Sequence, residues 1–94
     1  MTNLNMFVIL GTFVTMVDDD LFLKITDKDG HEFDLKLYAP PTFSSTLKSH
    51  LKKGAFMAVK GYIDSYPESD SLRLTAQKVT FLASGKDVVT NENN

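Results

Sequence analysis

The chain of 94 residues contains no cysteine and no tryptophan, and no apolar run approaches the length of a membrane-spanning helix. The absence of cysteine excludes disulfides and thiolate metal sites, and it is in keeping with a cytoplasmic location. Positive charge is also scarce: 10 Lys and Arg against 12 Asp and Glu give a formal net charge of −2 at pH 7. Any binding of a polyanion must therefore come from the local arrangement of cations rather than from overall charge.

Patterns typical of an active site are missing as well. The two histidines, His31 and His50, are isolated, and we find no glycine-rich phosphate loop and no Ser/His/Asp order. Three consecutive acids at residues 18–20 offer too few oxygen ligands for a hard cation, so we interpret them as a solvated turn. The sequence predicts no enzyme, no cofactor and no metal site.

What the chain does have is a series of runs rich in β-branched and aromatic residues. Residues 6–16 are predicted to form a first strand, bent at Gly11 and buried on both faces at its start. Residues 21–27 and 31–38 alternate apolar and polar side chains, and the Asp-Lys-Asp-Gly at 27–30 predicts a hairpin between them. The side chains expected to point inward are Leu21, Leu23, Ile25, Phe33, Leu35 and Leu37.

A helix is predicted after the prolines at 40 and 41, which cannot donate to a sheet ladder. Thr42 is the expected N-cap, and Gly54 is the expected stop of a helix of about three turns. Its apolar stripe is Phe43, Leu47 and Leu51. Its second half contains cations, which the helix dipole favours there: Lys48, Lys52 and Lys53.

Two further strands are predicted at residues 55–65 and 72–82, joined by a loop at 66–71. Gly61 bends the fourth strand, and a change of apolar parity before Val79 predicts a bulge near Gln77 and Lys78 in the fifth. Expected inward residues here are Val59, Gly61, Ile63, Leu72, Leu74 and Ala76. We interpret residues 1–82 as one domain and 83–94 as a short disordered tail.

The order of three strands, a helix and two strands predicts an all-β fold, a five-stranded OB-fold barrel with one short helix between strands three and four. An SH3-like barrel is the structural alternative, but a helix of about three turns at that position fits it poorly.

Three stretches resemble the bacterial single-stranded DNA-binding protein family. Residues 5–13 (NMFVILGTF) are similar to the family's opening strand. LKKG at 51–54 and VKGYI at 59–63 are similar to the end of its helix and to its fourth strand. VTFL at 79–82 is similar to its closing strand. The chain departs from the family in its short connection between the first two strands, its lack of Trp and its lack of a long acidic-tipped tail. The resemblance implies a trimmed relative that binds single-stranded DNA in replication, recombination or mobile-element transfer, without the tail's recruiting role.

Single-strand binding needs cations along the backbone and rings that stack on bases. The alternation places one Lys two residues from one aromatic on the outer face of each of three strands, and Asp34 and Asp64 interrupt this track. The candidate nucleic-acid-binding residues are Phe22, Lys24, Lys36, Tyr38, Lys60, Tyr62, Tyr66, Arg73 and Lys78. The plainer interpretation is that such side chains are ordinary solvated residues of strand faces.

Assembly is predicted from the first strand, because a small barrel buries only one of its two apolar faces. The expected partners are single-stranded DNA, or RNA, and further copies of this chain in a homodimer or homotetramer through that strand; no membrane and no small-molecule substrate are expected. The structural alternative is that the tail covers the outer face. The functional alternative is an OB-fold protein-interaction subunit of a replication, primosome or conjugation complex that binds DNA weakly or not at all.

Overall fold

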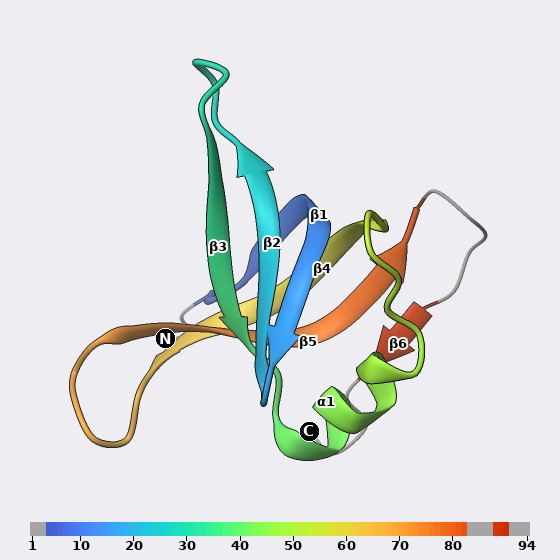
Figure 1. Ribbon diagram of the computed structural model, residues 1–94. Coiled ribbons are helices and arrows are strands. Elements are labelled where there is room, and N and C mark those ends of the chain that lie inside the picture. The colour runs from blue at the N-terminus through green and yellow to red at the C-terminus, as the bar shows by residue number, and fades with distance from the viewer. Residues whose placement is uncertain (1–3, 83–87, 91–94) are drawn as a thin grey trace.

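A closed five-stranded barrel forms the body of the protein in the computed structural model, which describes residues 4–82 and 88–90 (Figure 1). The elements in chain order are β1 (Phe7–Val17), β2 (Asp20–Thr26), β3 (Glu32–Tyr38), α1 (Pro41–Lys48), β4 (Phe56–Ser65), β5 (Leu72–Phe81) and β6 (Val88–Thr90). β1 pairs antiparallel with both β2 and β4, β4 pairs with β5, and a parallel Tyr38–Thr75 contact joins β3 to β5. The predicted OB-fold, with its helix between β3 and β4, is confirmed.

β1 is strongly coiled, and it therefore pairs with two different strands along its length (Figure 1). It pairs with β4 from Phe7 to Thr12 and with β2 from Thr12 onward, and Val14 is the extra residue of a bulge opposite β2. The break in pairing thus falls three residues after Gly11, where the bend was predicted. Gly11 lies just before Thr12, where β1 changes partner from β4 to β2, and it allows close approach: a Cβ there would lie 2.7 Å from Ile25 Cδ1 and 3.0 Å from the Lys24 carbonyl oxygen.

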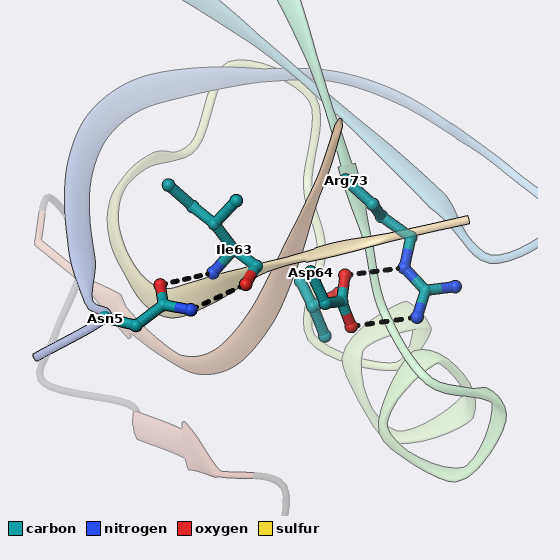
Figure 2. Close-up of polar contacts among 5 residues, drawn as sticks. Asn5, Ile63, Asp64 and Arg73 are labelled. Atoms are coloured by element: carbon teal, nitrogen blue, oxygen red, sulfur yellow. Dashed lines mark hydrogen bonds and ion pairs between the residues drawn. The ribbon is translucent and has the colours of Figure 1, made fainter. Parts of the chain in front are cut away.

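Asn5 extends the β1–β4 ladder beyond its first residue. Its Nδ2 donates to the Ile63 carbonyl oxygen at 2.7 Å, and its Oδ1 accepts from the Ile63 N–H at 2.9 Å (Figure 2). The amide of Asn5 therefore replaces a backbone pair and fixes where the chain enters the sheet.

The core follows most of the predicted alternation. Its buried apolar residues are Leu21, Leu23, Leu37, Ala39, Phe43, Leu47, Met57, Val59, Ala76, Val79 and Phe81. The predicted bulge in β5 is confirmed, because Lys60 pairs with Lys78 while Gly61 pairs with Ala76, which leaves Gln77 as the extra residue. This extra residue restores the inward direction of Val79.

Inward burial was wrongly predicted at the far ends of two hairpins. Phe33 is 46% exposed and Leu72 is 64% exposed, and Ile63 is exposed as well. Phe33 lies near the tip of the β2–β3 hairpin, which projects from the barrel (Figure 1). Alternation gives the face of a strand correctly, but the core does not reach these positions. The Asp27–Gly30 hairpin turn itself is confirmed: the Gly30 N–H donates to the Asp27 carbonyl oxygen at 3.0 Å.

The helix is shorter than predicted, 8 residues from Pro41 to Lys48. Thr42 lies inside it, and the N-cap is Pro40, whose ψ of 150° leads into a proline at the first helical position, where no N–H is needed. Gly54 does not stop the helix; at φ +83° it forms the turn into β4, since the Ala55 N–H donates to the Lys52 carbonyl oxygen at 2.9 Å. Lys52 and Lys53 accordingly lie exposed in this connection rather than on the helix.

Most of the predicted tail at 83–94 lies outside the described residues. Its described part, Val88–Thr90, forms β6 and pairs antiparallel with Lys78–Thr80 of β5. Within residues 4–82 and 88–90, no helix combines the length and the apolar character required to cross a bilayer.

Candidate nucleic-acid interface

A cluster of charged and aromatic side chains lies on the outer face where β3 and β5 close the barrel. β3 supplies two of its members, β5 two, the end of β4 one, and the first residue of the following loop one. We call this group the Arg73 cluster; it consists of Lys36, Tyr38, Asp64, Tyr66, Arg73 and Thr75. The pairing register brings it together, because Asp64 lies opposite Arg73 and Tyr38 lies opposite Thr75.

Arg73 is at the centre of the cluster. Its Nε and Nη2 each donate to a separate oxygen of Asp64 at 2.9 Å, the two-pronged geometry that suits a planar guanidinium (Figure 2). Its Cζ lies 4.3 Å from the centroid of the Tyr38 ring and 5.5 Å from that of the Tyr66 ring. Lys36 adds a second cation, with Nζ 5.2 Å from the Tyr66 ring centroid. Both tyrosine rings are therefore held against cations by cation–π attraction.

Asp64 is bound from a second direction by Thr75. The Thr75 hydroxyl donates to Asp64 Oδ1 at 2.9 Å, and Thr75 itself is only 1% exposed. The hydrogen bonds from Arg73 lower the pKa of Asp64 more than partial burial raises it, and the same pair raises the pKa of Arg73. Asp64 is thus a charged carboxylate whose charge is matched by Arg73, rather than a free acid interrupting a row of cations.

Phe22 and Tyr62 border the Arg73 cluster. Phe22 on β2 is half-buried and lies directly across from Lys36 on β3, so a third ring stands beside the cluster's lysine. Tyr62 on β4 is the cross-strand neighbour of Thr75, which in turn is the neighbour of Tyr38. The structure therefore brings together six of the sequence-predicted residues: Phe22, Lys36, Tyr38, Tyr62, Tyr66 and Arg73.

The remaining predicted lysines lie in other rows. Lys60 and Lys78 are exposed and face each other across β4 and β5, and Val8 of β1 lies on the other side of Lys60. Lys24 lies opposite Asp34 on the β2–β3 hairpin. Lys24 and Lys60 each lie two residues from a ring on their own strand, Phe22 and Tyr62, and no cation–π contact joins these lysines to the rings of the Arg73 cluster among the described residues.

The first half of β1 presents an exposed apolar row next to Lys60. Val8 is 57% exposed and Leu10 52%, and Met6, directly before the strand, is 51% exposed; we call these three residues the β1 outer face. The prediction that this end of the strand is buried on both faces is wrong, because only the alternate residues Phe7 and Ile9 pack against the core.

Asp64 and Thr75 are the members of the cluster that sequence reasoning missed. A signal for Asp64 was present: it precedes the loop at 66–71 by two residues, and Arg73 follows the loop by two, so a regular hairpin sets them opposite each other. Thr75 carried no comparable signal: its hydroxyl reaches Asp64 across the same β4–β5 pair, but alternation along a strand does not indicate that hydrogen bond.

No group of three or more His, Cys, Asp or Glu side chains within residues 4–82 and 88–90 is placed to hold an ion. Stacking, cation–π contact and hydrogen bonding are what this surface offers chemically.

Comparison with known proteins identifies the fold. The sequence matches no protein-family model and no curated protein. The dimeric structure of the N-terminal domain of PriB from Thermoanaerobacter tencongensis matches 85% of this chain and 98% of its own, at a TM-score of 0.59 and 14% identity. The mitochondrial single-stranded DNA-binding protein Rim1 of S. cerevisiae matches 90% of this chain and 100% of its own, at a TM-score of 0.62 and 17% identity. At these identities the likeness is one of architecture, and this chain has the OB-fold of both structures.

Proposed function

We propose that this protein binds single-stranded DNA with little sequence preference, by stacking and backbone contacts and without catalysis. One observation carries the proposal: two tyrosine rings, an arginine and a lysine are gathered on one outer face of the barrel. In OB-folds the face of strands two and three and the loop between strands four and five are common sites for oligonucleotides. The Arg73 cluster lies at the meeting of those two regions, and the similar Rim1 structure is that of a single-stranded DNA-binding protein.

Stacking supplies most of the expected affinity. Each stacked base contributes roughly 1–3 kcal/mol, so Tyr38, Tyr62 and Phe22 offer enough for useful binding despite an acidic chain. The exposed lysines flanking these rings are assigned to the phosphates: Lys24, Lys60 and Lys78. Roles in replication, recombination or mobile-element transfer are all compatible with such a site.

We also propose self-association through β1. Its first half is hydrogen-bonded to β4, whereas β2 pairs with β1 only from Thr12 onward, so among the described residues one edge of residues 7–11 is open. The β1 outer face beside this edge is apolar and exposed. A homodimer, or a homotetramer built from it, buries both features; the similar PriB domain structure is dimeric.

The second candidate is a protein-interaction subunit with weak DNA binding. The β2–β3 hairpin favours it, because its projecting end combines the exposed Phe33 with acids that repel phosphates: Asp27, Asp29, Glu32 and Asp34.

A titration separates the two candidates. Labelled oligo-dT of about 30 nucleotides, longer than the span of one OB-fold, is titrated with the protein at low and moderate salt, with duplex of equal length as control. We expect tight binding to the single strand alone, weakened by salt. Absence of binding at micromolar protein and low salt contradicts the proposed function and favours the interaction subunit.

A further inference from the structure

Asp64 is an unexpected residue for a surface that binds a polyanion. Its carboxylate lies inside the Arg73 cluster, and both its oxygens are used: Oδ1 accepts from Arg73 Nε and from Thr75 Oγ1, and Oδ2 accepts from Arg73 Nη2, each at 2.9 Å. A carboxylate so bound leaves the arginine with little net charge to offer a phosphate. Electrostatic attraction of phosphates therefore does not explain why Asp64 lies in this site.

Geometry supplies that role. A free arginine side chain is among the most flexible, and fixing it costs conformational entropy. Here the two hydrogen bonds to Asp64 fix the plane of the guanidinium, which lies 4.3 Å from the Tyr38 ring centroid. Because Thr75 is buried, its hydroxyl anchors the carboxylate to the barrel wall. The Tyr38 ring and the Arg73 guanidinium are thus already held together before any nucleic acid binds.

The same arrangement holds the base of the β4–β5 loop. Tyr66, the first residue of this loop, lies under Arg73 from β5 and under Lys36 from β3. The loop is closed by two backbone hydrogen bonds of 3.1 Å, from the Tyr66 N–H to Ser71 and from the Ser69 N–H to Tyr66. Releasing Arg73 removes one of the two cations that position this ring.

We propose that Asp64 is a positioning residue of the nucleic-acid site, which holds Arg73 as a flat stacking surface between β4 and β5 rather than as a phosphate contact. This inference rests on the proposed function, and it names the part that an acid plays in it. A preformed surface binds a base without the entropic cost of ordering its own side chains.

An electrostatic role of Arg73 and a positioning role of Asp64 predict opposite effects of Asp64→Asn on the binding of oligo-dT. The substitution removes a negative charge from the site and one of the two oxygens that hold the Arg73 guanidinium. If Arg73 acted through its charge, binding of oligo-dT would tighten, and the slope of log Kd against log salt would steepen by about 0.7 for one new phosphate contact. If Asp64 positions Arg73, binding weakens by about fivefold or more, the lower end of what removal of a base stack costs, with the salt slope unchanged.

The experiment measures Kd for oligo-dT of about 30 nucleotides across a salt series, for the unaltered protein, Asp64→Asn and the control Asp34→Asn. Asp34 is an exposed acid on the outer face of the neighbouring β3, so its substitution removes an equal charge without touching Arg73. We expect Asp34→Asn to bind as well as the unaltered protein or slightly better, and Asp64→Asn to bind worse. Tighter binding by both variants overturns the inference.

Arg73→Lys is the second variant, and it decides the matter if Asp64→Asn fails to fold. Lysine keeps the charge but lacks the planar fork, so a phosphate contact would survive and a stacking surface would not. Weakening by about fivefold supports the inference, and unchanged binding overturns it. If the unaltered protein does not bind the oligonucleotide, the proposed function and this inference both fall; if it binds and only the variants behave otherwise than expected, the inference alone falls.

Discussion

The β1 outer face and the Arg73 cluster both consist of outward-pointing residues on strands of the same barrel, yet they are built differently. On β1 the outward side chains are apolar and about half exposed: Met6, Val8 and Leu10. In the Arg73 cluster each cation lies against a ring, and Asp64 pairs with the arginine. Exposed apolar side chains gain free energy by being covered, whereas paired cations and rings offer an ordered polar surface. This contrast is the basis on which we propose assembly through the first face and nucleic-acid binding at the second.

On β4, Gly61 lies between Lys60, which neighbours the β1 outer face, and Tyr62, which borders the Arg73 cluster. The residue before it, Lys60, shares a cross-strand row with Val8 and Lys78, while the residue after it, Tyr62, lies in the row of Thr75. The bulge at Gln77 falls at the same point in β5. β4 and β5 thus come close together at Gly61, between the row of Lys60 and the row of Tyr62.

The largest expected effect is on folding, from Gly61→Ala. A Cβ at Gly61 would clash with the carbonyl oxygen of Thr75 and would lie 2.7 Å from Phe7 Cζ, so β4 and β5 must separate. We expect a loss of about 3 kcal/mol or more in the free energy of unfolding, measured by chemical denaturation. Gly30→Ala is the control: it has open space at φ +85° and should cost only about 1–2 kcal/mol. Equal losses would show that the crossing is not tight.

Next in size is the effect of Val8→Asp on assembly. A charge placed in a buried apolar contact is costly, so we expect the dissociation constant of the oligomer to rise at least about 100-fold, measured by sedimentation or light scattering. Leu72→Asp places the same charge on an exposed leucine of the β4–β5 hairpin and should leave assembly unchanged. If the oligomer is unaffected by Val8→Asp, the β1 outer face is not the surface through which the protein assembles.

Tyr38→Ala tests the other face. Because Tyr38 supports the Arg73 guanidinium, we expect its removal to weaken oligo-dT binding by about 1–3 kcal/mol. Tyr62→Ala, at the edge of the cluster, should also weaken binding, by less. Intrinsic Tyr fluorescence follows the titration, since no Trp masks it. If both variants bind like the unaltered protein, the Arg73 cluster is not the binding face.

A smaller effect separates the lysines of the two faces. We expect Lys36→Gln to weaken oligo-dT binding more than Lys60→Gln, because Lys36 both carries charge and positions Tyr66. Removing one lysine–phosphate interaction should lower the salt slope by about 0.7, which a salt titration measures. The reverse order would show that Lys60 contributes more to DNA binding than the lysine of the Arg73 cluster.

The smallest expected effect is a dependence of stability on pH through Asp64. Its pKa in the folded protein is lowered below the ordinary value of 3.8, mainly by the hydrogen bonds from Arg73. The stabilisation is therefore fully present above the unfolded pKa and is lost as pH falls through the lower, folded pKa. It amounts to no more than about 1 kcal/mol, because solvent screens a surface pair. Thermal unfolding should show a gap between the unaltered protein and Asp64→Asn that closes in acid; a gap that persists to about pH 2 contradicts this.

Sequence reasoning reached most of the fold because local patterns encode it. Alternation identified the faces of β2 and β3, the Asp-Gly turn identified their hairpin, and the parity change around Gln77 located the bulge. The helix was overestimated because Leu51 continues the apolar spacing after α1 has ended at Lys48. A periodic pattern shows which residues touch the core, and not whether the chain between them is helical.

The candidate site was predicted only in part. Spacing along single strands identified the outward aromatics and cations, including Tyr38 and Arg73. It placed Lys60 and Tyr62 on the same side of β4, where Val8 and Lys78 are the cross-strand neighbours of Lys60 and Thr75 is that of Tyr62. Alternation defines which way a side chain points from its strand, but which strands lie side by side depends on coiling and bulges.

The sequence by itself determined the strands, their hairpins, the core faces and the positions where glycine allows close crossing, because these depend on side-chain period and backbone sterics. Only the tertiary structure decided that Tyr38 of β3 lies against Arg73 of β5, and that Val8 of β1 lies beside Lys60. The physical reason is barrel closure. The β3–β5 contact joins residues 37 positions apart, Tyr38 and Thr75, and no local pattern specifies that pairing.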